Sequence, residues 1–366
     1  MIRKYEGDLT GHYKFGGIAG TIKYCNVSKC VNFGSVYTKY GKTSGIVGSI
    51  DGGKISDCLS DFHGNDGVLG ICEFKGKGTS VNNCLNMTTY KDISAYGNEW
   101  GDFKGEHNYS LTTAEDAYHT TKTTVATIKS GEICQLLGEN WEQNLGTDAY
   151  PTPTGSKGLY HTRKVSNKYG TICVPYPMQS DDNVKFYMLE EVKKGGDAVT
   201  LVFTYVDRLE AAYPAIFSVA EQGDYSFEPI DDDRHFLPFS AVPSVGSGWY
   251  LKGTFEKVVF EGEVAKERYY VSGDKICNAT KATIAPFRCY FLGPDVTTLT
   301  GSQAKAIQFT LEDEDGTTTA LELVGDDLVP ALQGGKTYSV MGAEVGEGYR
   351  GIVIKNGKKV MQNRNQ

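Results

Sequence analysis

Signals of several familiar classes of enzyme and metalloprotein are missing from this 366-residue sequence. It contains no GxxxxGK[ST] phosphate loop, no GxGxxG between a strand and a helix, no HExxH and no GxSxG elbow. The nine cysteines form no CxxC pair and no C-x₂₋₄-C…H-x₃₋₅-H spacing. We therefore expect no catalytic residues, no metal site and no cofactor.

Runs of positive charge and of apolar residues are also missing. The formal net charge is −8, and no lysine or arginine run exceeds two or three residues. Binding to phosphate groups needs clustered positive charge, so we expect no nucleic-acid partner. No apolar stretch approaches the roughly 18 residues that a membrane-spanning helix needs, so no membrane insertion is expected.

The first residues, MIRKYE, lack the apolar stretch of a signal peptide. Two explanations are open. Either the protein is cytoplasmic, or the chain is a piece of a longer exported protein whose signal lies upstream. The repeats described next begin almost at once, with no capping segment before them, which favours a fragment.

Glycine and tyrosine are abundant, at 44 and 23 residues, and proline is scarce, at 11. This composition indicates many short strands joined by tight turns, and the length indicates two or three folding units. We expect an all-β fold.

A repeat fills the N-terminal part of the chain. Cys30, Cys58 and Cys84 lie 28 and 26 residues apart, in the segments VSKCVN (27–32), ISDCLS (55–60) and VNNCLN (81–86). A degenerate fourth copy, EHNYSL (106–111), would align Tyr109 with the cysteines. A second column of short motifs accompanies the first: GIAG (17–20), GIVG (45–48), GVLG (67–70) and SAYG (94–97).

A period of 25–28 residues without helical periodicity is typical of one coil of a β-solenoid. Neighbouring coils would pair by parallel strands about 4.8 Å apart, so Cys30, Cys58 and Cys84 would form an inward structural ladder. The alternative, metal binding or redox chemistry at these thiols, is the weaker interpretation, since stacked cysteines are slightly too far apart for an easy disulfide. Residues 1–112 are thus assigned to β-helix repeats.

Gly-Ile-x-Gly followed by Val/Ile-Ser-x-Cys-x-Asn resembles the GLUG-type repeats of bacterial cell-surface proteins, which are abundant in Bacteroidetes. The resemblance covers about residues 11–111 and implies a right-handed β-helix. It also implies an extracellular or outer-membrane surface location.

Residues 113–158 break the repeat and form a capping or linker segment. ATIKSGEICQLLG (126–138) predicts a short helix that ends at Gly138, with Ile133, Leu136 and Leu137 on one face. The stretch from Gly131 to Pro151 is similar to the closing element after β-helical repeats in Bacteroidetes surface proteins. It would cover an open coil end, although Trp141 and Tyr150 could instead bind sugar.

Residues 159–295 predict a β-sandwich domain. The expected strands are 169–175, 184–192, 198–206, 215–219, 223–228, 248–260, 268–272 and 287–292. In one of them Val199, Phe203 and Tyr205 alternate with Thr200 and Thr204, which is the period of a half-buried strand.

YGTICVPYP (169–177) resembles the opening strand of a C-terminal β-domain in surface proteins of Prevotella and Bacteroides. Matches to the same family follow in order at AYPAIF (212–217), YYVSG (269–273), TIAPFRCYF (283–291) and IQF…GTTT (307–319). YSVMGAEV (338–345) and RGIVIKNGKKV (350–360) resemble the tail of surface-sorted proteins, except that Ala343-Glu344 replace the usual basic residues. Residues 296–366 are therefore expected to be a C-terminal β-domain or a sorting-like tail.

Other candidates for chemistry are few. The DDDRH cluster (231–235) could bind calcium, but a solvated acidic turn is the preferred interpretation. EDEDG (312–316) lacks the ligand order of a calcium loop and is expected to be a hairpin turn. Trp100, Trp141 and Trp249, with neighbouring tyrosines, are candidate ligand-binding residues.

Three functions remain at this point. The first is a non-catalytic surface protein for cell adhesion or extracellular binding, whose partner is a glycan or a protein. The second is a carbohydrate-binding module that uses exposed aromatic residues. The third is a glycan-active enzyme, or a non-catalytic part of one, because pectinases and polysaccharide lyases also use β-helices; the repeated columns here hold no paired carboxylates.

Overall fold

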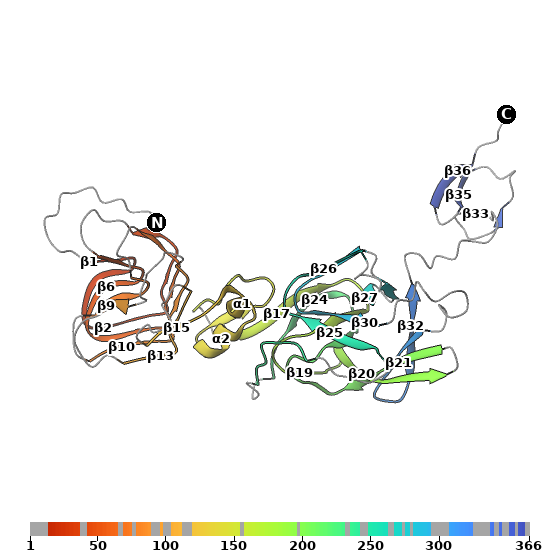
Figure 1. Cartoon of the computed structure of the whole chain (residues 1–366), viewed down its shortest axis with the longest axis horizontal. Helices are drawn as coiled ribbons and strands as arrows, with labels where there is room; N and C mark the ends of the chain where they lie inside the picture. The colour runs from red at the N-terminus through yellow and green to blue at the C-terminus, as the bar shows by residue number, and fades with distance from the viewer. Residues whose placement is uncertain are drawn as a thin grey trace. The chain divides into compact units, whose positions relative to one another are not determined.

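The structure, a computed structural model, describes most residues of the chain. These are residues 14–36, 42–64, 69–74, 78–88, 96–97, 104–111, 119–153, 157–195, 198–230, 235–241, 248–262, 267–272, 275–278, 281–293, 307–324, 337–339, 344–345, 351–355 and 358–362. Strands dominate them, so the fold is all-β, as expected (Figure 1). The chain divides into two compact units: residues 1–163, 175–178 and 224–238 form the first, and residues 164–174, 179–223 and 239–366 form the second.

Parallel sheets make up the N-terminal part of the first unit. One sheet has the order β12-β9-β6-β10-β13, with β2 also paired to β6. Its strands are β2 (Ala19–Ser28), β6 (Val47–Ser56), β9 (Cys72–Phe74), β10 (Thr79–Asn82), β12 (Tyr96–Gly97) and β13 (Lys104–Glu106). A second sheet has the order β15-β14-β11-β7-β3, from β3 (Val31–Asn32), β7 (Leu59–Ser60), β11 (Leu85–Asn86), β14 (Tyr109–Ser110) and β15 (Thr121–Lys122). Two short parallel pairs accompany them, β1 (Lys14–Gly16) with β5 (Lys42–Ser44) and β4 (Ser35–Val36) with β8 (His63–Gly64).

The register of these sheets follows the sequence repeat. Val31 pairs with Leu59 and Leu59 with Leu85, while Val27 pairs with Ile55 and Ile55 with Val81. Equivalent residues of successive repeats are therefore neighbours in space. Val27, Ile55 and Val81 contribute to one apolar core with the ladder cysteines, and Ile55, Cys58 and Val81 are fully buried there.

A left-handed residue recurs at the same place in every repeat. The residue before each ladder position has a φ of 52–54°: Lys29, Asp57, Asn83, His107 and His119. Asn, Asp and His enter this region more readily than most side chains. The same backbone turn therefore separates β2 from β3, β6 from β7 and β10 from β11.

This turn corrects the alignment of the fourth repeat. Tyr109 pairs with Leu85, not with Cys84. The residue that follows left-handed His107 is Asn108, so Asn108 occupies the ladder position. Its amide donates to the carbonyl of Val81 at 2.7 Å, and its Oδ1 accepts from the N–H of Cys84 at 3.1 Å. The fourth copy has asparagine where the other copies have cysteine, so alignment by the cysteine spacing alone selected the neighbouring Tyr109.

The glycine column is also shifted in its third copy. Val47 pairs with Cys72, so Gly45 corresponds to Gly70 and not to Gly67. A Cβ on Gly45 would collide with Ser60 Oγ, and one on Gly70 with the side chain of Asn86. Glycine recurs at this position because the polar residue that ends each short strand, Asn32, Ser60 or Asn86, fills the space that a Cβ would need.

Two short helices replace the single helix expected at 126–138. They are α1 (Val125–Lys129) and α2 (Glu132–Leu137), separated by Gly131 with a φ of 92°. A Cβ on Gly131 would meet Leu159 and Leu145 at 2.8 and 2.9 Å. The end at Gly138 is confirmed. Of the three apolar residues expected on one face, Ile133 and Leu137 are buried and Leu136 is 43% exposed. A small sheet, β16 (Glu142–Asn144), β17 (Gly158–Val165) and β24 (Gly223–Phe227), follows.

A ten-stranded mixed sheet dominates the second unit. Its order is β18 (Tyr169–Ile172), β23 (Ala215–Val219), β20 (Val184–Gly195), β21 (Ala198–Val206), β31 (Ile307–Glu312), β32 (Thr318–Val324), β28 (Lys275–Asn278), β27 (Arg268–Ser272), β30 (Arg288–Leu292) and β25 (Tyr250–Thr254). β21 pairs with β31 and β28 with β32 in parallel, and the other neighbouring strands of this sheet pair in the antiparallel direction. Further strands are β19 (Met178–Gln179), β22 (Arg208–Leu209), β26 (Val258–Glu261) and β29 (Lys281–Ile284).

The strands expected from alternation are largely confirmed. β20, β21, β23 and β27 match their predicted ranges closely, and Leu201 and Phe203 of β21 are fully buried. The stretch 248–260 holds two strands instead of one, β25 and β26. β31 and β32 lie in the middle of the large sheet, so the boundary expected at residue 295 does not separate two sheets.

The last strands form a separate antiparallel sheet of order β34-β33-β35-β36. They are β33 (Thr337–Ser339), β34 (Glu344–Val345), β35 (Gly351–Lys355) and β36 (Lys358–Gln362). The segments that resemble a sorting tail therefore contain paired strands.

Candidate functional site

Two of the three candidate tryptophans are core residues. Trp141 is 0% exposed and Trp249 is 2% exposed. The indole of Trp249 packs against Tyr269, with ring centroids 5.1 Å apart, and meets Phe309 edge-on at 6.1 Å. Neither ring can stack on a ligand, so their assignment as ligand-binding residues is corrected. Trp100 lies outside the described residues.

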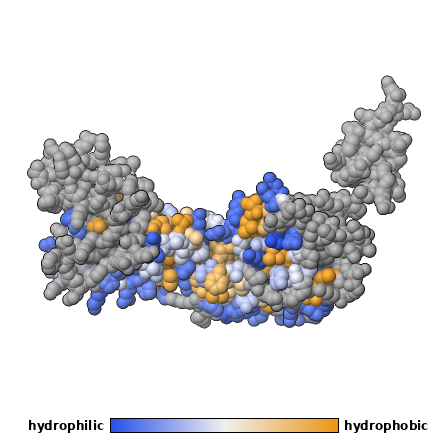
Figure 2. Space-filling view, in the orientation of Figure 1, coloured by the Kyte–Doolittle hydropathy of each residue, from blue (hydrophilic) through white to orange (hydrophobic). Residues whose placement is uncertain are grey.

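A partly exposed aromatic pair does occur in the first unit, at residues that sequence reasoning did not join. The rings of Phe33 and Tyr150 lie 5.6 Å apart and are tilted by 39°. Phe33 is 51% exposed. The tilt prevents the two rings from forming one flat platform. On the face drawn in Figure 2, hydrophobic and hydrophilic residues are interspersed.

The ladder cysteines lie one above another inside the first unit. Cys58 and Cys84 are buried and Cys30 is partly exposed; all three are free thiols. Each donates to the carbonyl two residues earlier, at 3.2, 3.2 and 3.3 Å for Cys30, Cys58 and Cys84. Burial raises the pKa of Cys84 well above its usual range, and it does the same for Cys72 in the same core. Cys72 and Cys84 are therefore protonated at neutral pH and are poor nucleophiles. The hydrogen bond with Cys84 instead lowers the pKa of Cys58.

A polar pocket of about 190 Å³ lies beside strands of the ten-stranded sheet. Strands β18, β20, β23, β31 and β32 supply most of its wall, and the turns beside them supply the rest. Its lining combines charged, hydroxyl, amide and apolar side chains: Lys168, Tyr169, Asp182, Asn183, Lys185, Tyr187, Ser218, Val219, Ala220, Leu311, Asp313 and Thr319.

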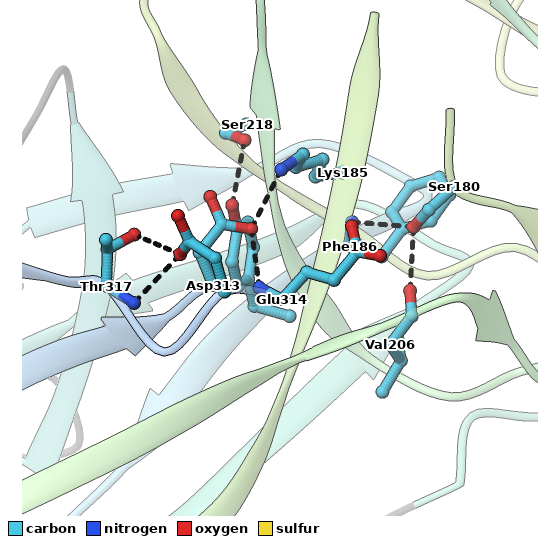
Figure 3. Close-up of polar contacts among 10 residues, drawn as sticks. Ser180, Lys185, Phe186, Val206, Ser218, Asp313, Glu314 and Thr317 are labelled. Atoms are coloured by element: carbon cyan, nitrogen blue, oxygen red, sulfur yellow. Dashed lines mark hydrogen bonds and ion pairs between the residues drawn. The ribbon is translucent and has the colours of Figure 1, made fainter. Parts of the chain in front are cut away.

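An ion pair and a hydroxyl pair are the fixed polar contacts in the pocket (Figure 3). Lys185 Nζ lies 2.9 Å from Asp313 Oδ1, and the two side chains are about one-third exposed. The hydrogen bond to Asp313 raises the pKa of Lys185, so this lysine stays charged. Tyr187 Oη lies 3.3 Å from Ser218 Oγ, and burial raises the pKa of Tyr187.

Turn geometry holds Asp313 in place. The turn between β31 and β32 closes through hydrogen bonds from the Asp313 N–H to Thr317 O and from the Gly316 N–H to Asp313 O. Gly316 has a φ of 79°. The hairpin expected at 312–316 is confirmed. The other acidic cluster, 231–235, lies almost wholly outside the described residues.

Two charged groups at the pocket are open to solvent. Lys168 and Asp182 are exposed, and the described residues place no carboxylate in ion-pair contact with Lys168. The Lys168 ammonium lies 5.3 Å from the centre of the Tyr169 ring. The pocket therefore presents one unpaired cation and one exposed carboxylate beside a closed ion pair.

Sequence reasoning missed this pocket because its parts are far apart in the chain. Lys185 and Asp313 are 128 residues apart, and no short motif links them. The one available signal was the EDEDG turn, which sequence analysis considered only as a calcium loop or a hairpin.

Searches for similar proteins found no family model, curated protein or solved structure that matches this chain. Within the described ranges, no group of three or more His, Cys, Asp or Glu side chains is placed to hold a metal ion. Of the helices in those ranges, none has the length and apolar character needed to cross a membrane.

Proposed function

We propose that this chain is a non-catalytic, surface-exposed bacterial protein that serves cell adhesion or extracellular binding. The polar pocket of the second unit carries this proposal. It offers fixed donors and acceptors without an activated nucleophile, which suits recognition of a ligand more than its conversion. Function is argued from this site and not from the fold.

The first unit is proposed to be a right-handed β-helix, or β-solenoid, that acts as a stalk. Three features support this: the in-register parallel strands, the left-handed residue repeated in each copy and the buried columns of equivalent side chains. The GLUG-like motifs fit the same architecture. Helices α1 and α2 follow β15, the last strand of the five-stranded parallel sheet, and we propose that they cover that end of the stack.

For the second unit we propose a β-sandwich-like binding domain. Its sheet buries a large aromatic core that includes Phe203, Phe291 and Phe309. The surface-protein resemblance of its strands supports a location outside the cell or on the outer membrane. We propose an extracellular glycan or protein as the partner.

A carbohydrate-binding module is the second candidate, and the mixture of hydroxyl, amide and charged groups in the pocket favours it. A glycan-active enzyme is the third. Glycosidases need two carboxyl groups, one acting as an acid and the other as a base or nucleophile. At this pocket Asp313 is engaged by Lys185 and by the N–H of Glu314, which disfavours that role.

The test is to apply the purified chain to a glycan array and, in parallel, to surfaces coated with extracellular proteins. Saturable binding to glycans supports the carbohydrate-binding form of the proposal, and saturable binding to protein surfaces alone supports adhesion through protein contacts. Absence of binding to both, by a chain shown to be folded, would refute the proposal.

A further inference from the structure

We infer that the pocket lined by Lys168, Asp182 and Tyr187 binds one neutral, polyhydroxylated sugar ring at the end of a glycan. This inference rests on the proposed binding function and assigns it a site and a ligand class.

The first argument is the balance of donors and acceptors. A sugar hydroxyl both donates and accepts hydrogen bonds, so it is best held between groups of opposite kinds. The Lys168 ammonium only donates, the Asp182 carboxylate only accepts, and Asn183 can do both. The hydroxyls of Ser218 and Thr319 add further groups that can do both. Such alternation suits several adjacent hydroxyls.

The second argument is charge. Two lysines and two aspartates line the pocket, so its formal charge is zero. Lys185 and Asp313 neutralise each other at 2.9 Å. A free anion in the pocket would be repelled by the Asp182 carboxylate, and a free cation would be repelled by the Lys168 ammonium. A neutral ligand avoids both repulsions, while an acidic sugar or a phosphate does not.

The third argument is size and shape. At about 190 Å³ the cavity is smaller than the roughly 300–1,000 Å³ of pockets for larger organic ligands. It can enclose one ring, with the rest of a glycan left outside. Leu311, Val219 and Ala220 supply apolar wall for the C–H face of the ring, between the polar groups.

The experiment is a titration of the chain of residues 1–366 with neutral hexoses, hexuronates and a free amino acid, followed by isothermal calorimetry or ligand-observed NMR. Two variants alter the pocket, Lys168→Ala and Asp182→Ala. Two matched controls change equally exposed residues that do not line it, Lys164→Ala and Asp224→Ala. All four positions are exposed, so the variants are expected to fold, which circular dichroism checks.

We expect a neutral hexose to bind and each pocket variant to lose roughly tenfold or more in affinity, as for a hydrogen bond to a charged group. The controls should bind as the unaltered chain does. Hexose binding that the pocket variants leave unchanged would overturn this site while the proposed function stands. Tighter binding of the hexuronate or amino acid would overturn the ligand class. If no sugar binds at all, the inference is wrong, and the protein-surface assay described above decides the proposed function separately.

Discussion

The two units of this protein reach a buried β core in different ways. In the first unit, contacts join residues one repeat apart, as in the hydrogen bond from the Lys54 N–H to Asn26, 28 residues away. In the second unit, contacts join distant segments, as in the hydrogen bond from the Cys289 N–H to Thr171, 118 residues away. The first core is made of small aliphatic and thiol side chains, and the second is rich in aromatic rings. In the first unit, the core is therefore built from contacts between equivalent residues of neighbouring repeats and not from contacts between distant segments.

The largest expected effect concerns the aromatic core of the second unit. Trp249→Ala removes a side chain packed on Tyr269 and Phe309, and large-to-small changes of this kind cost about 3–5 kcal/mol. Hydrogen-exchange mass spectrometry should show faster amide exchange in β25, β27, β30 and β31. The exchange rates in the parallel sheets of the first unit should stay the same. Equal loss of protection in both units would contradict their separation. Tyr24→Ala, at a residue 82% exposed, is the control and should change little.

A smaller effect is expected from a methyl group added between repeats. Gly45→Ala would bring a Cβ against Ser60 Oγ, the Gly70 carbonyl and Phe62. Overpacking of this kind costs about 1–3 kcal/mol. Denaturant unfolding, followed by a spectroscopic signal from the first unit, measures this loss in the free energy of unfolding. Gly20→Ala is the matched control, because its Cβ would meet only the Lys14 carbonyl, at 3.2 Å. Equal stability of the two variants would show that the glycine column is not required for packing.

Alkaline pH should weaken the first unit through its buried thiols. Burial raises the pKa of Cys72 above its value in the unfolded chain. The folded state then holds a proton that the unfolded state loses, so the stability from this thiol is complete below about pH 8.5 and falls as the pH rises above it. The slope should approach about 1.4 kcal/mol per pH unit for each such thiol. Thermal unfolding from pH 7 to 10 should show a shallower decline in Cys72→Ala than in the unaltered chain; an unchanged slope would argue against this origin.

The smallest effect is expected at the ion pair of the pocket. Lys185→Met breaks the contact with Asp313 but leaves the sheet core intact. Partly exposed ion pairs contribute about 0–1 kcal/mol. The free energy of unfolding of the second unit, measured with a chemical denaturant, should therefore fall by no more than about 1 kcal/mol. Added salt should make this difference smaller. A loss of several kcal/mol in the free energy of unfolding would mean that the ion pair stabilises the sheet and does not mainly line the pocket.

The same contrast between the units explains what the sequence could predict. Composition predicted the all-β class, and the repeat predicted that equivalent residues of successive copies lie in register. The spacing misplaced Tyr109 by one residue, because the fourth copy holds Asn108 where the others hold cysteine, and it misplaced the third glycine motif by three residues, because Gly70 aligns with Gly45. In the second unit, alternation found strands such as β20 and β21 but not their neighbours. Only the fold brings Lys185 and Asp313 together, and only burial shows that Trp141 and Trp249 are core residues.

The central claim is that this chain binds an extracellular ligand without changing it. Incubating the purified chain with an oligosaccharide that it retains, then measuring both the bound fraction and the release of new reducing ends, tests that claim most directly. The account predicts reversible binding, with the oligosaccharide recovered intact. New reducing ends that appear in proportion to the amount of chain and to time would contradict it.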